Sequence, residues 1–264
     1  MALNQKTLRL NKAISDTGFC SRRDADKAIL ERRVTINGRE AILGDKVSDS
    51  DDVRVDDRRV RFKDESDSIY IAFNKPKGIT CTTERHVEGN IIDYIGHPRR
   101  IFPIGRLDKL SEGLIFLTSD GDIVNKVLRA GNNHEKEYVV TVNKPITIDF
   151  LRKMGNGVPI MDTVTQKCLV RKEGESTFNI ILTQGLNRQI RKMCEYLGYD
   201  VTRLKRTRVM NITTKNIPVG TFRNLTREEV SEIMGLVSRS SKTEEASKGD
   251  TGVRKVSKKQ NKYI

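Results

Sequence analysis

The chain has 264 residues, a formal net charge of +14 and a sequence pI of about 9.7. This length predicts about two domains. The excess of lysine and arginine favours a nucleic-acid partner, because cationic side chains neutralise phosphates and release their counterions. The rival partner, a membrane, lacks support, since the sequence has no apolar run of about 18 residues, no signal-peptide core and no amphipathic helix with a basic rim.

The cysteines and histidines are isolated along the chain. None falls in a Cys-x-x-Cys pair or at the spacing of metal ligands. We therefore expect reduced thiols in a cytoplasmic protein, with no disulfides, no metal site and no redox cofactor. The residues concerned are Cys20, Cys81, Cys168 and Cys194, with His86, His97 and His134.

Residues 1–63 predict a small separate module. Apolar residues recur at helical spacing over 10–14, and a second helix is expected after Ser21, which can form a capping box with Asp24. Short strands are expected at 34–36, just before an Asn-Gly turn, and at 53–55.

This order resembles the S4-type RNA-binding module, through residues 9–12, 20–23 and 34–38. In that family two helices and the adjoining turn present basic side chains to RNA. The alternative is that these side chains form a solvated face with nearby aspartates. The resemblance implies RNA contacts for Lys12, Arg22, Arg23 and Arg32.

A polar linker at 64–68 precedes a larger domain at 69–238. Apolar runs predict its strands, and a helix is expected after Ser119 or Asp120 that Gly131 can end. Many strands and few helices, without regular alternation, predict an α+β fold with a mixed, mainly antiparallel sheet and flanking helices. The expected strands are 69–73, 114–117, 137–142 and 178–182.

The last residues, 239–264, are rich in serine, lysine, threonine and glycine. They hold too little apolar surface to offset the entropy of ordering, so we expect a disordered basic tail. Upstream, the basic segment 203–208 has two interpretations: it lines an RNA path, or it is a charged edge strand of the sheet.

Asp108 lies in a turn before the apolar run 114–117, beside Arg106 and Lys109. A carboxylate next to a buried strand must be solvated, paired or used, because an unpaired buried charge is costly. A lone aspartate in a turn is most often a cap or an ion-pair partner. By the same argument, Tyr138 near the start of a strand is most often a core aromatic.

A third segment, 187–197, predicts a helix capped by Asn187 and ended by Gly198. One face is apolar and the other is basic. The basic face can hold a carboxylate or a phosphate, or it can be merely solvated. The apolar face carries Ile190, Met193, Cys194 and Leu197, and the basic face Arg188, Arg191 and Lys192.

Together these segments resemble the pseudouridine synthases of the bacterial ribosomal-RNA branch, which carry an S4-type module in front. The matching motifs are Gly-Arg-Leu-Asp at 105–108, Lys-Glu-Tyr at 136–138 and Arg-Gln-Ile-Arg at 188–191, with a weaker Asn-Lys-Pro-x-Gly at 74–78. Ser111 stands where the family commonly has threonine, so the hydroxyl is kept. The resemblance covers the chain to about Leu236.

The resemblance implies a role for each matched side chain. The essential carboxylate either attacks the uridine or removes a ribose proton, and the sequence leaves both routes open. The tyrosine stacks on a flipped uracil, and an arginine pairs with the carboxylate. Another arginine fills the gap in the RNA stack, and two further cations contact RNA. The carboxylate is Asp108, the tyrosine is Tyr138, and the arginine that pairs with the carboxylate is Arg191. Arg106 fills the gap in the RNA stack, and Lys136 and Arg188 are the two further cations that contact RNA.

The implied reaction is isomerisation of uridine to pseudouridine in ribosomal RNA, with the large subunit favoured and no metal or other cofactor. Two alternatives are a non-catalytic RNA-binding protein of ribosome assembly, and an acid-using nuclease or glycosidase. The latter needs a metal or a second carboxylate, and no motif supplies one. The sequence leaves the target uridine open, and also whether a tRNA is a second substrate. It requires no state above a monomer.

Overall fold

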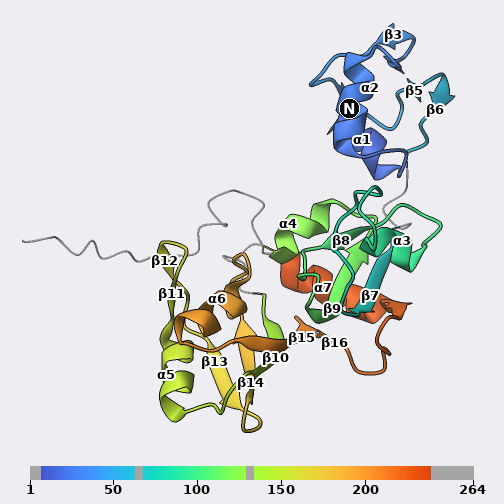
Figure 1. Cartoon of the computed structure of the whole chain (residues 1–264). Coiled ribbons are helices and arrows are strands. Elements are labelled where there is room, and N and C mark those ends of the chain that lie inside the picture. The colour runs from blue at the N-terminus through green and yellow to red at the C-terminus, as the bar shows by residue number, and fades with distance from the viewer. Residues whose placement is uncertain (1–6, 63–67, 129–133, 239–264) are drawn as a thin grey trace, which may run out of the picture.

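The computed structural model describes residues 7–62, 68–128 and 134–238. The predicted tail, most of the predicted linker and Gly131 lie outside these ranges, and the domain division stays a prediction. Figure 1 shows the blue N-terminal elements gathered at one end, above the elements that follow residue 68.

The N-terminal elements enclose a core of their own, which includes Leu10, Ile14, Val34 and Val53. The predicted capping box is confirmed: the Ser21 side chain accepts from the backbone of the second helix, and the Asp24 carboxylate accepts from the backbone of Ser21. The elements are β1 (Leu8–Arg9), α1 (Leu10–Asp16), α2 (Arg22–Leu30), β2 (Val34–Ile36), β3 (Arg39–Glu40), β4 (Lys46–Val47), β5 (Val53–Val55) and β6 (Arg58–Arg59).

A large sheet forms the rest of the molecule, with the strand order β13-β14-β10-β15-β9-β7-β17, and with β16 and β8 paired to β15 and β9. In the described residues its neighbouring strands are antiparallel, apart from the parallel pair β9 and β15. The strands are β7 (Tyr70–Lys75), β8 (Phe102–Ile104), β9 (Glu112–Thr118), β10 (Lys136–Val142), β13 (Leu169–Lys172), β14 (Thr177–Leu182), β15 (Val201–Val209), β16 (Ile212–Thr213) and β17 (Phe222–Asn224).

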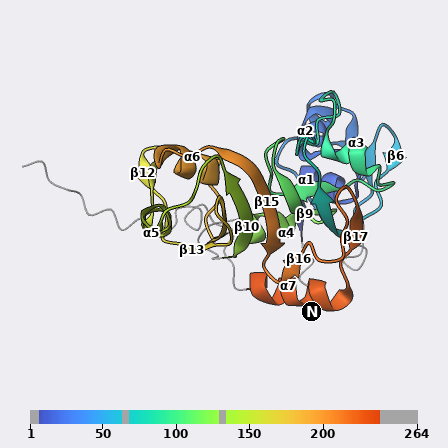
Figure 2. The same cartoon turned by 60° about the horizontal axis from the view of Figure 1, so that its bottom comes forward.

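Helices pack on both halves of this sheet. In Figures 1 and 2, α5 and α6 lie with β10, β13 and β14, whereas α4 and α7 lie with β7 and β9. The predicted α+β class and mixed, mainly antiparallel sheet are confirmed. The remaining elements are α3 (Ile91–Ile95), α4 (Asp122–Leu128), α5 (Ile148–Asn156), α6 (Gln189–Tyr196) and α7 (Arg227–Ser238), with the hairpin β11 (Pro159–Ile160) and β12 (Thr163–Val164).

The basic strand β15 corrects one prediction, because it lies in the middle of the sheet and not at an edge. Its arginine side chains form hydrogen bonds and ion pairs with the neighbouring strands. Arg206 is buried and donates its Nε to the carbonyl of Leu114 at 2.6 Å. Arg203 and Arg208 form ion pairs with carboxylates of β9 and β10, at 2.5 and 2.7 Å. These cations therefore bind strands together.

Gly113 is the point where β9 meets β15, opposite Arg206. Its φ is +108°, and a Cβ there would lie 2.1 Å from the carbonyl oxygen of Arg206. Only glycine satisfies both constraints, since an L side chain is strained at this φ and backbone atoms cannot yield. The contact joins the two halves of the sheet directly behind the turn that carries Asp108.

Gly113→Ala is expected to lower the free energy of unfolding by about 3 kcal/mol or more, through strain and overpacking. Urea unfolding followed by circular dichroism measures the loss. The control is Gly235→Ala in α7, where a Cβ meets nothing within 4 Å. There the better helix propensity should raise stability by up to about 1 kcal/mol. Equal unfolding midpoints for the two variants would contradict the role of the Gly113 contact.

Candidate functional site

The turn that carries Asp108 lies between β8 and β9 and is closed by a hydrogen bond from the Ser111 N–H to the Asp108 carbonyl, at 2.9 Å. Leu107 is buried, and its N–H donates to the Cys81 thiol sulfur at 3.5 Å. Arg106 is exposed. The alternation of an exposed arginine, a buried leucine and a carboxylate that is 38% exposed fixes which way the aspartate points.

The start of α6 differs from the sequence prediction. Asn187 does not cap it; the helix begins at Gln189, and Arg188 precedes it in the left-handed region with φ 51°. The buried Gln189 side chain closes the turn, because its Oε1 accepts from the backbone N–H of Leu186 at 3.0 Å. The Gln189 side chain, within the helix, thus accepts a backbone hydrogen bond at this turn in place of the cap expected from Asn187. The left-handed backbone at Arg188 is strained.

Arg191 is held by two neutral acceptors. Its Nη1 donates to the carbonyl of Val201 at 3.1 Å, and its Nη2 donates to the Ser111 hydroxyl at 3.3 Å. Ser111 is fully buried. With both terminal nitrogens fixed, Nε faces Asp108, and it lies 3.6 Å from Oδ2. The guanidinium is therefore oriented towards the carboxylate without depending on it.

Several of the predicted side chains line one cavity of about 90 Å³. Its lining includes Arg106 and Asp108 from the turn, Tyr138 from β10 and Arg188 from the start of α6. Arg191 reaches the same carboxylate from α6. Tyr138 is half-buried and also packs against apolar residues of both halves of the sheet. The core interpretation of Tyr138 and its predicted place beside Asp108 are thus both compatible with the structure.

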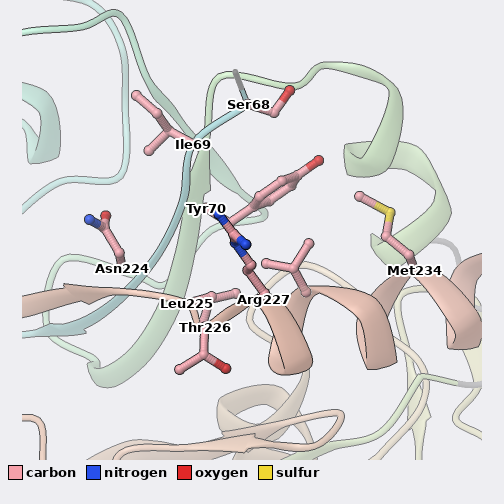
Figure 3. Close-up of a pocket in the computed structure, with 9 residues that line it drawn as sticks. Ser68, Ile69, Tyr70, Asn224, Leu225, Thr226, Arg227 and Met234 are labelled. Carbon is pink, nitrogen blue, oxygen red and sulfur yellow. The ribbon is translucent and has the colours of Figure 1, made fainter. Parts of the chain in front are cut away.

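A second cavity, of about 480 Å³, lies between β7 and α7 (Figure 3). Tyr70, Asn224, Leu225, Arg227 and Met234 are among the residues that line it. Its lining contains no carboxylate, histidine or cysteine among the described residues. The smaller cavity, which has an oriented carboxylate and cations around it, is therefore the candidate active site.

Lys136, predicted to contact RNA, is instead buried at 6% exposure. Its ammonium donates to the carbonyls of His134 and Thr183, at 2.9 and 3.2 Å. Burial, with the nearby charge of Arg206, lowers the pKa of Lys136 from 10.5 to about 8. The side chain anchors the start of β10 two residues before Tyr138 and does not reach the surface.

Lys12 also differs from its prediction. It is 20% exposed and forms ion pairs with Asp16, at 2.5 Å, and with Asp122 of α4, at 3.3 Å. The ion pair with Asp122 links helix α1 of the N-terminal module to α4. The other three predicted contacts are exposed; Arg32 pairs with Glu40 at 3.7 Å, and Arg22 and Arg23 begin α2.

Lys75 is a residue near the site that the sequence analysis gave no role beyond the weaker motif match at 74–78. It ends β7, is fully buried, and donates to the carbonyl of Pro76 at 2.8 Å. Burial lowers the pKa of Lys75 below its ordinary value, and the opposing charges of Cys81, Asp108 and Glu112 only partly offset this effect. Its place in the Asn-Lys-Pro-x-Gly segment was the signal in the sequence, but nothing there showed that it lies behind Asp108.

Across the part of the chain that the structure describes, no cluster of three or more histidine, cysteine, aspartate or glutamate side chains is arranged to hold a metal ion. None of the described helices is both long enough and apolar enough to traverse a bilayer.

Known proteins resemble this chain in sequence as well as in fold. A family profile described as RNA pseudouridylate synthase matches residues 69–196, and an S4 domain profile matches residues 8–53. The dual-specificity RNA pseudouridine synthase RluF of Salmonella typhi is 55% identical over 239 residues, which are 90% of this chain and 83% of that protein. The chain belongs to the RNA pseudouridine synthase family.

Further members of the RNA pseudouridine synthase family extend the comparison. RluF of Escherichia coli (strain K12) is 53% identical over 90% of this chain and 82% of its own length. Ribosomal large subunit pseudouridine synthase B of Bacillus subtilis is 32% identical over 86% of this chain and 96% of its own. A crystal structure of a pseudouridylate synthase superposes with a TM-score of 0.63 at 25% identity, over 86% of this chain and 99% of that one.

These relatives also bear on the subgroup within the family. The residues at 109–113 and 134–138 predict a resemblance to large-subunit rRNA pseudouridine synthase F, and the identity to RluF confirms it. The chain is accordingly an RNA pseudouridine synthase with an S4 domain in front.

The low pKa of Lys136 predicts a pH effect on the stability of this synthase. Between about pH 8 and 10.5 the unfolded chain keeps the proton that the folded protein has released, so stability rises with pH. Relative to Lys136→Met, the free energy of unfolding of the wild type should rise by about 3 kcal/mol as the pH increases across this window. Urea midpoints of both proteins at pH 7.5 and 10.5 measure the difference, in which all other titrating groups cancel. A pH-independent difference, or an Nζ that titrates by NMR near 10.5, would contradict the prediction.

Proposed function

We propose that this RNA pseudouridine synthase isomerises one specific uridine of large-subunit ribosomal RNA, with Asp108 as the essential carboxylate. The observation that carries the proposal is that Asp108 and Tyr138 line one cavity, while the Arg191 guanidinium lies 3.6 Å from the Asp108 carboxylate. A second RNA substrate is supported by the words "dual-specificity" in the names of the RluF relatives. We further propose a cytoplasmic monomer with an RNA-binding module at 1–63 and a catalytic domain at 69–238.

The reaction begins when the uridine leaves the RNA stack, at a cost of a few kcal/mol that is smallest where the base is already unpaired. Exposed Arg106, at the mouth of the cavity, takes the place of the base in the stack. The Tyr138 ring forms one wall against the uracil. The base is then fixed beside Asp108, in a site from which it excludes water.

The carboxylate supplies the chemistry. It either bonds to the nucleoside or removes a ribose proton so that a glycal forms. On either route the bond between N1 and the ribose breaks, the uracil turns in place, and C5 bonds to the ribose. C5 loses its proton and N1 gains one, so atoms and electrons balance without a redox partner. Arg191, at 3.6 Å, offsets the cost of enclosing the negative charge.

Asp108→Asn tests this assignment. It should lower pseudouridine formation by about a thousandfold or more while changing RNA affinity by less than about twofold, because it removes the reacting group but not its shape. Chemical mapping of pseudouridine in large-subunit rRNA and in a tRNA pool gives the readout. The control is Asp149→Asn on α5, whose exposed carboxylate pairs with Arg152 and Lys153. Wild-type turnover in Asp108→Asn would end the proposal, and binding without product by the wild type would favour an assembly protein.

Ser111 is proposed as a positioning residue, since its buried hydroxyl accepts a hydrogen bond from Arg191. Ser111→Ala removes one hydrogen bond to a charged group, worth about 1.5–3 kcal/mol, so kcat should fall about 10- to 100-fold with little change in KM. Ser111→Thr keeps the hydroxyl and should restore the rate. Equal rates for the alanine and threonine variants would show that the hydroxyl does not orient the guanidinium.

A further inference from the structure

Gln184 lines the candidate active site together with Asp108 and Tyr138. It lies between the end of β14 and the start of α6, and it is partly buried. Much of the remaining lining is apolar and is formed by five residues: Leu107, Leu182, Leu186, Ile190 and Leu204. In a mostly apolar cavity, the few polar groups decide by their placement which ligand fits. The amide of Gln184 is such a group.

Two donors fix the orientation of the Gln184 amide. The backbone N–H of Gln166 donates to its Oε1 at 3.2 Å, and the Nε2 of Gln189 donates to the same oxygen at 3.4 Å. A backbone N–H bonds only to the oxygen of a side-chain amide, so this contact decides which end of the amide is oxygen and which is nitrogen. The nitrogen, with its two hydrogens, is therefore the end that is left to bind a ligand.

The groups around this amide are themselves held in place. The Oε1 of Gln189 accepts from the backbone N–H of Leu186 at 3.0 Å, so the side chain that donates to Gln184 is fixed. The carbonyl of Thr183, the preceding residue, accepts from the Lys136 ammonium at 3.2 Å. The amide is thus preorganised, and little side-chain freedom is lost when a ligand binds to it.

The Nε2 of Gln184 has no acceptor among the described residues, because the hydrogen bonds of this side chain within them both end on Oε1. The nitrogen is also accessible. In the described part of the chain, the fully buried side-chain atoms without a partner belong to Asp52 and Asn74. An accessible amide donor at the wall of an apolar cavity is complementary to a carbonyl oxygen of the ligand.

Uracil carries a carbonyl oxygen on each side of N3, at C2 and at C4. Isomerisation turns the ring about the axis through N3 and C6, because N1 and C5 exchange places. The same turn exchanges the two carbonyls. A donor that faces one of them before the bond to N1 breaks therefore faces the other after the turn. Cytosine differs, because its C4 carries an amino group, which is a donor and repels an amide N–H.

We propose that Gln184 is a specificity residue, whose Nε2 donates to a carbonyl oxygen of the target uracil both before and after the ring turns. The inference rests on the proposed function, because it takes the flipped uracil as the ligand of the cavity. The amide holds the freed base beside Asp108 during the turn. It also disfavours cytidine, whose ring has a carbonyl on one side of N3 only.

The test removes the donor and keeps the oxygen, in Gln184→Glu, whose carboxylate can still accept from Gln166 and Gln189. A second variant, Gln184→Met, removes the donor without adding charge. The matched control, Asn156→Asp, makes the same amide-to-carboxylate change on an exposed residue of α5 outside the cavity. Thermal unfolding verifies that all three variants are folded.

The substrates are three RNA hairpins that carry uridine, 2-thiouridine or 4-thiouridine at the target position located by chemical mapping. Sulfur accepts a hydrogen bond more weakly than oxygen does. Its larger size affects the wild type and the variants alike, so a difference between their thio effects reports the hydrogen bond. A merely structural role for Gln184 would leave the thio effects unchanged.

On the uridine hairpin, kcat/KM of Gln184→Glu should fall about tenfold or more, whereas the control should match the wild type. Each thio substitution should slow the wild type about 3- to 10-fold, and should slow both Gln184 variants less. Thio effects that are equal in the wild type and both variants would overturn the proposal, as would wild-type kcat/KM in Gln184→Glu. Failure of the proposed function is separate, because it appears as wild-type protein that forms no pseudouridine from the uridine hairpin.

Discussion

The parallel contact between β9 and β15 is the constraint on which the rest of the structure depends. Gly113 lets the two backbones meet, and Arg206 ties them by donating to the carbonyl of Leu114. The turn with Asp108 runs directly into β9, and α6 precedes β15. Bringing those two strands together therefore brings Asp108 towards Arg191, whose Nη1 is anchored on Val201 at the start of β15. The candidate site is a product of strand pairing.

Buried positive charge is satisfied in a consistent way around this contact. The cations of Lys75, Lys136, Arg191 and Arg206 each donate to a backbone carbonyl. Neutral acceptors fix a cation's place without cancelling its charge, so its field still acts on its surroundings. Asp108 differs, because it is more exposed and faces a guanidinium at 3.6 Å. The scaffold thus places immobilised positive charge, on Arg191 and Lys75, beside an accessible carboxylate.

The sequence predicted local features well and distant pairings poorly. The capping box of Ser21, the strand at 34–36 and the apolar face of α6 follow from neighbouring residues, and all are confirmed. Lys12, Lys136 and the basic strand β15 were misplaced, since one partner of each lysine, Asp122 and Thr183, and the strands that flank β15 lie far away in the chain. The start of α6 was missed for a subtler reason: Gln189 and Asn187 can both close a turn, and only the fold decides between them.

The left-handed backbone of Arg188 has a consequence for the history of this chain under mutation. A φ of 51° costs a residue with a Cβ roughly 1–2 kcal/mol, which glycine at the same place would recover. That exchange would also delete the guanidinium from the cavity. Under the RNA contact predicted for Arg188, selection for heat resistance and selection for substrate binding pull this one position in opposite directions. A thermophilic descendant that keeps arginine there must find its added stability elsewhere.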